Sequence, residues 1–79
     1  LPPETSRTVG RGKSADFVIN SAMVSRIHCH LSTSTSDLIV EDLRSTNGTF
    51  VNGSRIQKSK LHVGDLLRLG RFELSVSKE

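Results

Sequence analysis

Three polar segments contain the residue types that could do chemistry. They are residues 10–14, 25–28 and 45–53, and each lies beside runs that are patterned like β-strands. Together they supply hydroxyl groups, guanidinium groups and a carboxamide, all of which can donate hydrogen bonds to an oxyanion. If the three segments converge, they could hold a phosphate group and the peptide backbone beside it. This is the chemistry of a binding site rather than of a catalytic site.

The rest of the chain carries the patterns of short β-strands, whereas helical periodicity is weak throughout. Strands are predicted over residues 6–9, 17–19, 28–31, 38–42, 49–51, 54–56, 61–63, 66–69 and 72–76, the last with the alternation of a half-buried strand. Residues 32–36 predict a hairpin loop, and Asn52-Gly53 favours the positive φ angles of a type I′ turn. The sequence therefore predicts an all-β fold, a small antiparallel β-sandwich whose loops gather at its ends.

Size, charge and composition narrow the classes of function. The 79 residues suffice for one domain with a thin core, since such a chain buries only roughly 60–65% of its unfolded surface. The single cysteine cannot form an internal disulfide, and no apolar run approaches the ~18 residues that span a membrane. The net charge of +3 favours a negatively charged partner. The basic residues are scattered, however, and aromatic residues are few, so a nucleic acid is an alternative rather than the expected partner.

The order and spacing of the motifs resemble those of forkhead-associated (FHA) domains. The resemblance runs from Thr8 to about Val76 and rests on Gly10-Arg11, Ser25-Arg26-Ile27-His28, Ser45-Thr46-Asn47-Gly48-Thr49, Asn52-Gly53, Val63-Gly64-Asp65 and the alternating last strand. It implies an eleven-stranded sandwich that binds phosphothreonine peptides through loops at one end. Such domains usually open with a strand well before the Gly-Arg pair, for which this chain has almost no room. We therefore expect residues 1–79 to be an FHA domain that lacks its first strand, an N-terminally incomplete fragment of a larger protein.

The resemblance also implies a role for each motif residue. The residues expected to contact the phosphopeptide are Arg11, Ser25, Arg26, Thr46 and Asn47. Guanidinium and hydroxyl groups would donate to the phosphate, and the carboxamide could bridge the peptide backbone on either side of the phosphoresidue. The residues expected to support the site without touching the ligand are Gly10, His28, Gly48, Asn52 and Gly53.

The loop before Ser25 is expected to read the third residue after the phosphothreonine. Met23 falls where some relatives of the family place an arginine that selects an acidic residue. Its flexible thioether offers an apolar surface, which predicts a preference for Ile, Leu or Val over Asp. The alternative is that Met23 packs into the core. The other contacts also have plainer explanations, because Arg11 and Arg26 could be solvated surface residues and Ser25 could serve only in a turn.

Catalytic and metal-binding interpretations of the same residues find little support. On a strand, His28 and His30 share one face while Cys29 points to the other, so the three do not form a metal site. Ser25, His28 and Asp42 could be taken for a hydrolase triad, but no nucleophile elbow accompanies them. We therefore expect no catalytic residue, no metal and no cofactor, and we do not expect the chain to be an enzyme.

The sequence favours a phosphothreonine-dependent peptide-binding module that recruits phosphorylated proteins in signalling. The expected partner is a phosphothreonine-containing protein or peptide and not a membrane, and the domain is expected to be monomeric and intracellular, in the nucleus or the cytoplasm. One alternative is a basic nucleic-acid-binding domain, which a steep, sequence-independent dependence on salt would favour. The other is an FHA fold that binds an unphosphorylated protein, against which the intact phosphate-contacting positions weigh.

Overall fold

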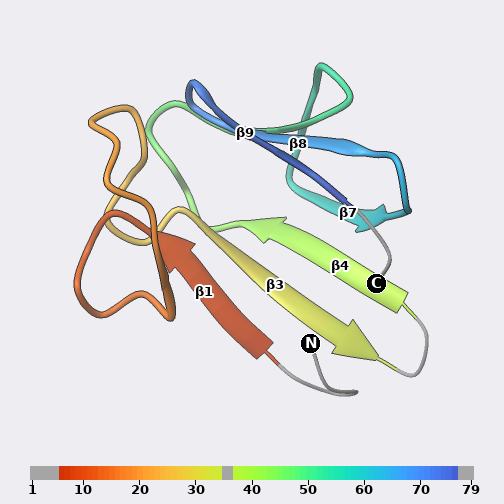
Figure 1. The fold of residues 1–79 in the computed structure, drawn as a ribbon, viewed down its shortest axis with the longest axis horizontal. Coiled ribbons are helices and arrows are strands. Elements are labelled where there is room, and N and C mark those ends of the chain that lie inside the picture. Colours follow the sequence, from red (N-terminus) through yellow and green to blue (C-terminus); the bar gives the residue numbers. More distant parts are fainter. Residues whose placement is uncertain (1–5, 35–36, 77–79) are drawn as a thin grey trace.

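The computed structural model describes residues 6–34 and 37–76, which form two β-sheets packed face to face (Figure 1). The first sheet contains β1 (Ser6–Gly10), β2 (Phe17–Val18), β3 (Cys29–Ser34), β4 (Asp37–Asp42) and β7 (Lys58–Leu61), in the order β2-β1-β3-β4-β7. The second contains β5 (Thr49–Val51), β6 (Ser54–Ile56), β8 (Leu66–Leu69) and β9 (Phe72–Ser75), in the order β6-β5-β8-β9. Neighbouring strands are antiparallel except β1 and β2, which run parallel. The described residues contain no helix, and the prediction of an all-β sandwich is confirmed.

Residues 32–34, predicted to belong to a loop, are part of β3. They pair with β4 in the register Ser32↔Ile39, Thr33↔Leu38 and Ser34↔Asp37. The prediction was wrong here because pairing with a neighbouring strand extends the ladder into a sequence whose own composition favours a turn. The rest of the predicted loop, residues 35–36, lies outside the described residues.

The strand predicted over residues 61–63 is wrong in its position. β7 ends at Leu61, and the chain turns directly afterwards. Asp65 makes this turn, because its carboxylate accepts a hydrogen bond from the backbone N–H of His62 (2.8 Å) while its own backbone N–H donates to the His62 carbonyl (3.0 Å). Val63 lies in the turn with 66% of its surface exposed, so its apolar, β-branched side chain gave a misleading strand signal.

The apolar core lies between the two sheets. Its buried members alternate along the strands with residues that face outward, as the two-residue period of a strand requires. They are Val9, Val24, Cys29, Val40, Val51, Leu61, Leu67 and Leu69. None carries an aromatic ring, so the core is built from small and mid-sized side chains and is thin.

A tight turn joins β5 to β6 and is tied to the turn that follows β7. Asn52 and Gly53 have φ angles of 51° and 86°, the positive values predicted for this Asn-Gly pair. The Asn52 side chain donates from Nδ2 to Asp65 Oδ1 (3.0 Å) and accepts at Oδ1 from the backbone N–H of Leu66 (2.9 Å). These bonds fix the end of β5 that lies away from residues 45–48.

The space between the sheets is open on one side, next to β9. Among the described residues no strand pairs with the outer edge of β9. Phe72 and Leu74 lie on the same face as the buried Leu69 and Leu67, yet they are 36% and 37% exposed. The half-buried character predicted for the last strand is therefore wrong for β9, whose residues are all exposed.

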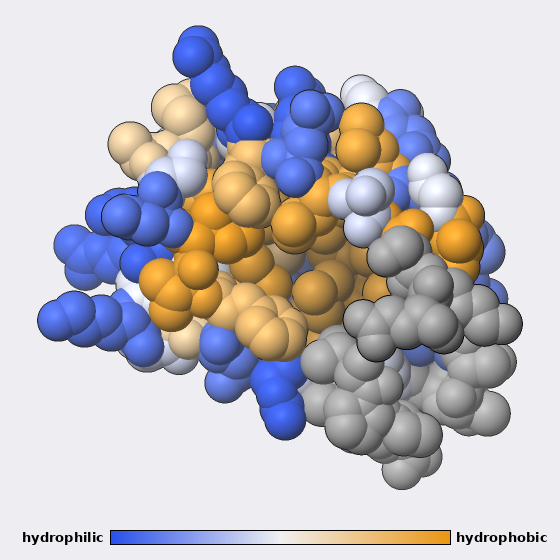
Figure 2. Space-filling view, viewed as in Figure 1, coloured by the Kyte–Doolittle hydropathy of each residue, from blue (hydrophilic) through white to orange (hydrophobic). Residues whose placement is uncertain are grey.

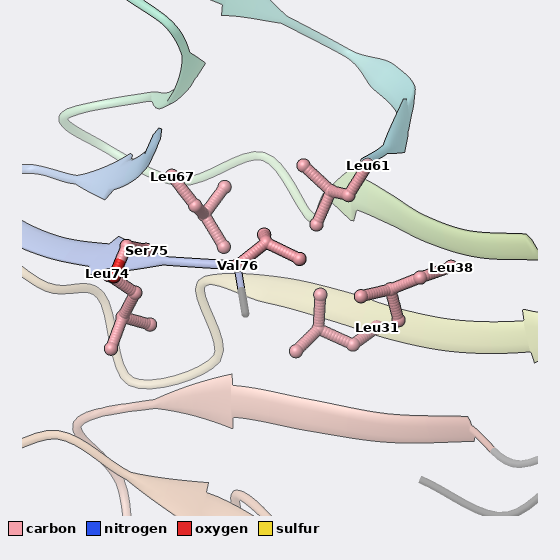
Figure 3. A pocket seen from close by; sticks show the side chains of 7 residues that line it. All are labelled: Leu31, Leu38, Leu61, Leu67, Leu74, Ser75 and Val76. Atoms are coloured by element: carbon pink, nitrogen blue, oxygen red, sulfur yellow. The ribbon is translucent and has the colours of Figure 1, made fainter. Parts of the chain in front are cut away.

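Beside β9 the core opens into a hollow of about 270 Å³. Figure 2 shows apolar residues gathered around a hollow on this face of the molecule. Figure 3 shows the side chains that line it, which are contributed by Leu31, Leu38 and Leu61 of the first sheet and by Leu67, Leu74 and Val76 of the second sheet and its end. The described part of the chain thus leaves the interior partly uncovered along the β9 edge.

Candidate functional site

The polar segments singled out in the sequence lie together at one end of the sandwich. Residues 11–16 join β1 to β2, residues 19–28 join β2 to β3, and residues 43–48 join β4 to β5. In Figure 1 the first two loops, in orange, lie beside the green segment after β4 and the blue turn between β8 and β9. Hydrogen bonds between the loops, described below, fix this arrangement.

The backbone of the first loop is bound directly to that of the second. The N–H of Arg11 donates to the Ser25 carbonyl (2.9 Å), and the N–H of Gly12 donates to the Arg26 carbonyl (2.9 Å). Gly10 permits this approach, because a Cβ atom at this position would lie 2.0 Å from the Arg26 carbonyl oxygen. The role expected for Gly10, to support the site, therefore has a steric basis.

The Arg11 side chain is partly used to hold the loops. Its Nε donates to the Val24 carbonyl (3.1 Å), which anchors the guanidinium against residues 19–28. The two terminal nitrogens have no hydrogen-bond partner among the described residues, and Arg11 is exposed. A guanidinium that is fixed at Nε and free at its other nitrogens is suited to bind an oxyanion in two-pronged geometry.

Ser25 and Thr46 are brought together by a bond between the second and third loops. The Ser25 hydroxyl oxygen accepts a hydrogen bond from the backbone N–H of Thr46 (3.0 Å). Since a hydroxyl both accepts and donates, the Ser25 proton is left for a ligand. Thr46 is exposed, as is Arg26, which lies next to Ser25.

Asn47 joins the third loop to the segment expected to set specificity. Its Nδ2 donates to the Met23 carbonyl (2.8 Å), so Oδ1 remains available as an acceptor.

Met23 is 36% exposed and lies outside the core, so the alternative in which it packs into the core is excluded. The turn between β8 and β9 packs against the backbone of Met23 at Gly70. A Cβ atom at position 70 would lie 2.4 Å from the Met23 carbonyl oxygen, so a glycine is needed for this close approach. Gly70 was missed in the sequence, where nothing links it to a loop some fifty residues earlier.

His28 is fully buried beneath the site and contacts two of its loops. Its Nδ1 accepts a hydrogen bond from the backbone N–H of Ser25 (3.0 Å). Because Nδ1 accepts, the proton of the neutral ring resides on Nε2, which lies 2.8 Å from the Gly48 carbonyl and donates to it. One imidazole therefore ties the Ser25 loop to the loop that contains Thr46 and Asn47.

The buried carboxylate of Asp42 organises the third loop and was missed in the sequence as part of the site. It accepts hydrogen bonds from the Thr49 hydroxyl (2.7 Å), from the Ser45 backbone N–H (3.3 Å) and from the Ser45 hydroxyl, whose oxygen in turn accepts from the Gly48 N–H (3.0 Å). Burial raises the pKa of Asp42, but the hydrogen bonds from Ser45 and Thr49 outweigh this effect, so the pKa is lowered overall. The only feature of the sequence that indicates this hydrogen-bond network is the Asp-x-x-Ser spacing before the Asn-Gly turn.

Asn52 and Gly53, expected to support the site, lie at the far end of β5. The Asn52 side chain fixes the hairpin through hydrogen bonds to Asp65 and Leu66, so any support that the pair gives to the three loops passes through β5. Gly48 lies at the near end, and its carbonyl accepts the bond from His28.

The structure gives no basis for nucleophilic or metal chemistry at Cys29. Its side chain is fully buried, and burial, with a smaller contribution from Asp42, raises the pKa of the thiol to about 12. Within the described ranges no group of three His, Cys, Asp or Glu side chains is placed to hold a metal ion.

The charges on the three loops are almost all positive. Arg11, Lys13, Arg26 and Arg44 are exposed there. The acidic residues of these loops and their flanks already accept hydrogen bonds within the fold. Asp16 accepts from Thr8, and the buried Asp42 accepts from Thr49. The surface at this end of the sandwich is therefore suited to an anionic ligand.

The family model of the FHA domain matches residues 7–70, and the chain belongs to this family. Among curated proteins, the chain is 40% identical over 74 residues to the ABC transporter ATP-binding/permease protein Rv1747 of Mycobacterium tuberculosis, covering 94% of this chain and 8% of that protein. It is 40% identical over 73 residues to the FHA domain-containing protein FhaA of the same organism, covering 92% of this chain and 14% of FhaA. The chain thus spans only a small part of either relative.

Solved structures of FHA domains superpose closely on the chain. One, from a structural and functional analysis of phosphothreonine-dependent FHA domain interactions, has a TM-score of 0.92 at 37% identity, covering 100% of this chain and 81% of that one. The FhaA FHA domain in complex with the intracellular domain of Rv3910 has a TM-score of 0.85 at 38% identity, covering 92% of this chain and 80% of that one.

Replacing His28 with alanine should lower the melting temperature and weaken ligand binding together. The variant loses both bonds that join the loops and leaves the Gly48 carbonyl and the Ser25 N–H without their buried partner, a loss of roughly 1–3 kcal/mol per group. Thermal unfolding and calorimetric titration measure the two effects. A variant that loses binding at an unchanged melting temperature would indicate that His28 contacts the ligand directly.

Replacing Asp42 with asparagine should reduce the dependence of stability on pH in the acid range. The pKa of Asp42 in the folded state lies below its ordinary value of 3.8, so its carboxylate adds stability that is present above pH 3.8 and is lost as the pH falls through the lower folded value. Urea unfolding across this range should show a shallower decline for Asp42→Asn than for the unaltered protein. Glu73→Gln, which removes an exposed carboxylate of β9, is the control and should keep the original decline. Identical declines for Asp42→Asn and the unaltered protein would contradict this account of the loop.

Proposed function

We propose that this chain is a phosphothreonine-dependent peptide-binding module that recruits phosphorylated proteins in signalling. The observation that carries the proposal is the convergence of Arg11, Ser25 and Thr46, each with a donor left unused by the fold. A phosphate group brings about −1.5 to −2 charges and three acceptor oxygens, so phosphorylation would turn a peptide from a non-ligand into a ligand. Arg26 and Asn47 complete the site, Arg26 on the phosphate and Asn47 on the peptide backbone.

The relatives support the same class of function. FHA domain interactions described as phosphothreonine-dependent are the subject of one close structure, and another contains the FhaA FHA domain with an intracellular protein domain. We infer a phosphothreonine-containing protein as partner, a monomeric domain and no catalytic role for this chain. No described helix is long and apolar enough to cross a membrane. Because the relatives compared above are bacterial, we place the domain in the cytoplasm rather than in a nucleus.

We also propose that a further strand, contributed by sequence before residue 1, completes the domain. The outer edge of β9 is unpaired among the described residues, and the leucine-lined hollow lies directly beside it. Two solved structures match this chain over its whole length while the match covers only 81% of each, so about a fifth of each lies outside the match. An added strand would pair with β9 and cover the hollow without touching the three binding loops.

The decisive experiment is binding to an oriented phosphothreonine peptide library, with the unphosphorylated library as its control. The proposal requires selection from the phosphorylated library alone. Equal binding to both libraries would favour an FHA fold that binds unphosphorylated protein. Binding to arbitrary nucleic acids with a steep dependence on salt would favour the nucleic-acid alternative.

Replacing Arg11 with alanine should weaken phosphothreonine-peptide binding tenfold or more. A hydrogen bond to a charged group contributes roughly 1.5–3 kcal/mol, and about 1.4 kcal/mol is a factor of ten in affinity. Calorimetry measures the affinity, and thermal unfolding controls for loss of the bond to Val24. Unchanged affinity at an unchanged melting temperature would place the site elsewhere.

Replacing Met23 with arginine should shift the preferred third residue after the phosphothreonine from Ile, Leu or Val toward Asp. The exposed side chain at position 23 would exchange an apolar surface for a guanidinium. Peptide-library profiles of both proteins measure the shift. Enrichment of Asp by the unaltered protein would contradict the assignment of Met23 as the specificity residue.

Extending the chain at its N-terminus with its natural flanking sequence should raise the melting temperature and suppress binding of a hydrophobic dye. The added strand would bury Phe72, Leu74 and the hollow, and each Å² of apolar surface removed from water contributes roughly 25 cal/mol. The 79-residue chain is the reference. Equal melting temperatures and equal dye binding would show that the flanking sequence does not cover the β9 edge.

A further inference from the structure

The outer face of the second sheet carries two arginines that the site described above does not use. Arg55 on β6, Phe50 on β5 and Arg68 on β8 are direct neighbours and form a row across three adjacent strands. They face away from the core, because Thr49 and Val51 on either side of Phe50 are buried. The guanidinium carbon of Arg68 lies 4.2 Å from the centre of the Phe50 ring, a cation–π contact that fixes the arginine over the ring.

Arg55 connects this row to the candidate site. An ideal Cβ on Gly48 would lie 3.0 Å from Arg55 Nε and 3.2 Å from its Cζ, so the guanidinium rests against the Gly48 backbone. The Phe50 ring lies against the same point, with Cε1 3.1 Å from that Cβ position. Gly48 follows Thr46 and Asn47 directly, so Arg55 lies at the border between the candidate site and the outer face of the sheet.

The charge of this row is largely uncompensated. The ion pairs found among the described residues involve Asp37 and Asp65, neither of which lies in the row. Glu73 is the cross-strand neighbour of Arg68 on β9 but forms no ion pair with it. Arg55 is exposed and has no acidic neighbour in the row, so its guanidinium is free to bind an anion from solution.

We propose that Arg55, together with Phe50 and Arg68, forms a second anion-binding site that is continuous with the phosphothreonine site. It binds a second anionic group of the same peptide, a carboxylate or a second phosphate, where the peptide leaves the loops and crosses Gly48 onto the sheet. This inference rests on the proposed function. A guanidinium donates paired hydrogen bonds to carboxylates and phosphates alike, so the row fits either group. The Phe50 ring holds the Arg68 guanidinium in place through their cation–π contact.

The test compares three kinds of phosphothreonine peptide on the full-length protein that contains this chain. The first has alanine at all flanking positions, the second carries one aspartate at successive flanking positions, and the third carries a second phosphothreonine at those positions. Calorimetry should show that an anion at one or two positions raises the affinity roughly tenfold, the magnitude of one charge-assisted hydrogen bond. Comparison of the second and third kinds shows which anion the row prefers.

Variants of Arg55 and Arg68 test whether the gain in peptide affinity depends on the row. Arg55→Ala should abolish the gain and leave the affinity for the alanine-flanked peptide unchanged, and Arg68→Ala should reduce the gain. Lys58→Ala removes an exposed positive charge from β7 of the other sheet, so it is the matched control and should keep the full gain. Melting temperatures check that each variant is folded.

Three results would overturn the inference. They are the absence of any gain in the unaltered protein, a gain that survives in Arg55→Ala, and an equal loss of affinity for all peptides in Arg55→Ala, which would assign Arg55 to the first phosphate. If the alanine-flanked phosphopeptide itself does not bind, the proposed function fails as well. The result with this peptide therefore distinguishes failure of the second site from failure of the first.

Discussion

His28 makes the contact on which the rest of the site depends. Its ring is fully buried and joins two loops, by accepting from the Ser25 N–H and donating to the Gly48 carbonyl. Only the neutral ring with its proton on Nε2 makes both bonds. Without them, the side-chain hydrogen bonds that still join these loops would be the exposed ones from Thr46 to Ser25 and from Asn47 to Met23. The geometry of the candidate site therefore depends on a buried side chain that joins two of its loops.

The other residues of the candidate site use some of their hydrogen-bonding groups within the fold and leave others unpaired at the surface. Arg11 uses Nε for the loop and keeps its terminal nitrogens, Ser25 accepts from the backbone and keeps its proton, and Asn47 uses its amino group and keeps its oxygen. Each side chain is therefore already oriented before a ligand arrives, so little side-chain entropy remains to be lost on binding. The Asp42 network does the same for the backbone of residues 45–49, where a buried carboxylate replaces the regular pairing that a loop lacks.

Much of this architecture could be predicted from the sequence, because it depends on local rules. The Asn52-Gly53 turn follows from the φ angles that this pair tolerates, and most strands follow from apolar alternation. The parts that were missed depend on contacts between distant segments. Nothing in the sequence connects Gly70 to Met23, and the role of Asp42 becomes visible only when the loop that it organises is folded over it. The exposure of β9 was missed for a related reason, since alternation identifies a face that favours burial but does not supply the element that covers it.

A backbone amide NMR titration can establish whether the three converging loops form one phosphate-binding surface. A phosphothreonine peptide should shift the amide signals of residues 11–12, 23–26 and 46–48 in the same concentration range, and its unphosphorylated counterpart should shift none of them. The signals of β7 and of the hollow beside β9 should stay in place. Phosphate-dependent shifts confined to β7 and the hollow, with the three loops unaffected, would show that the phosphopeptide binds elsewhere.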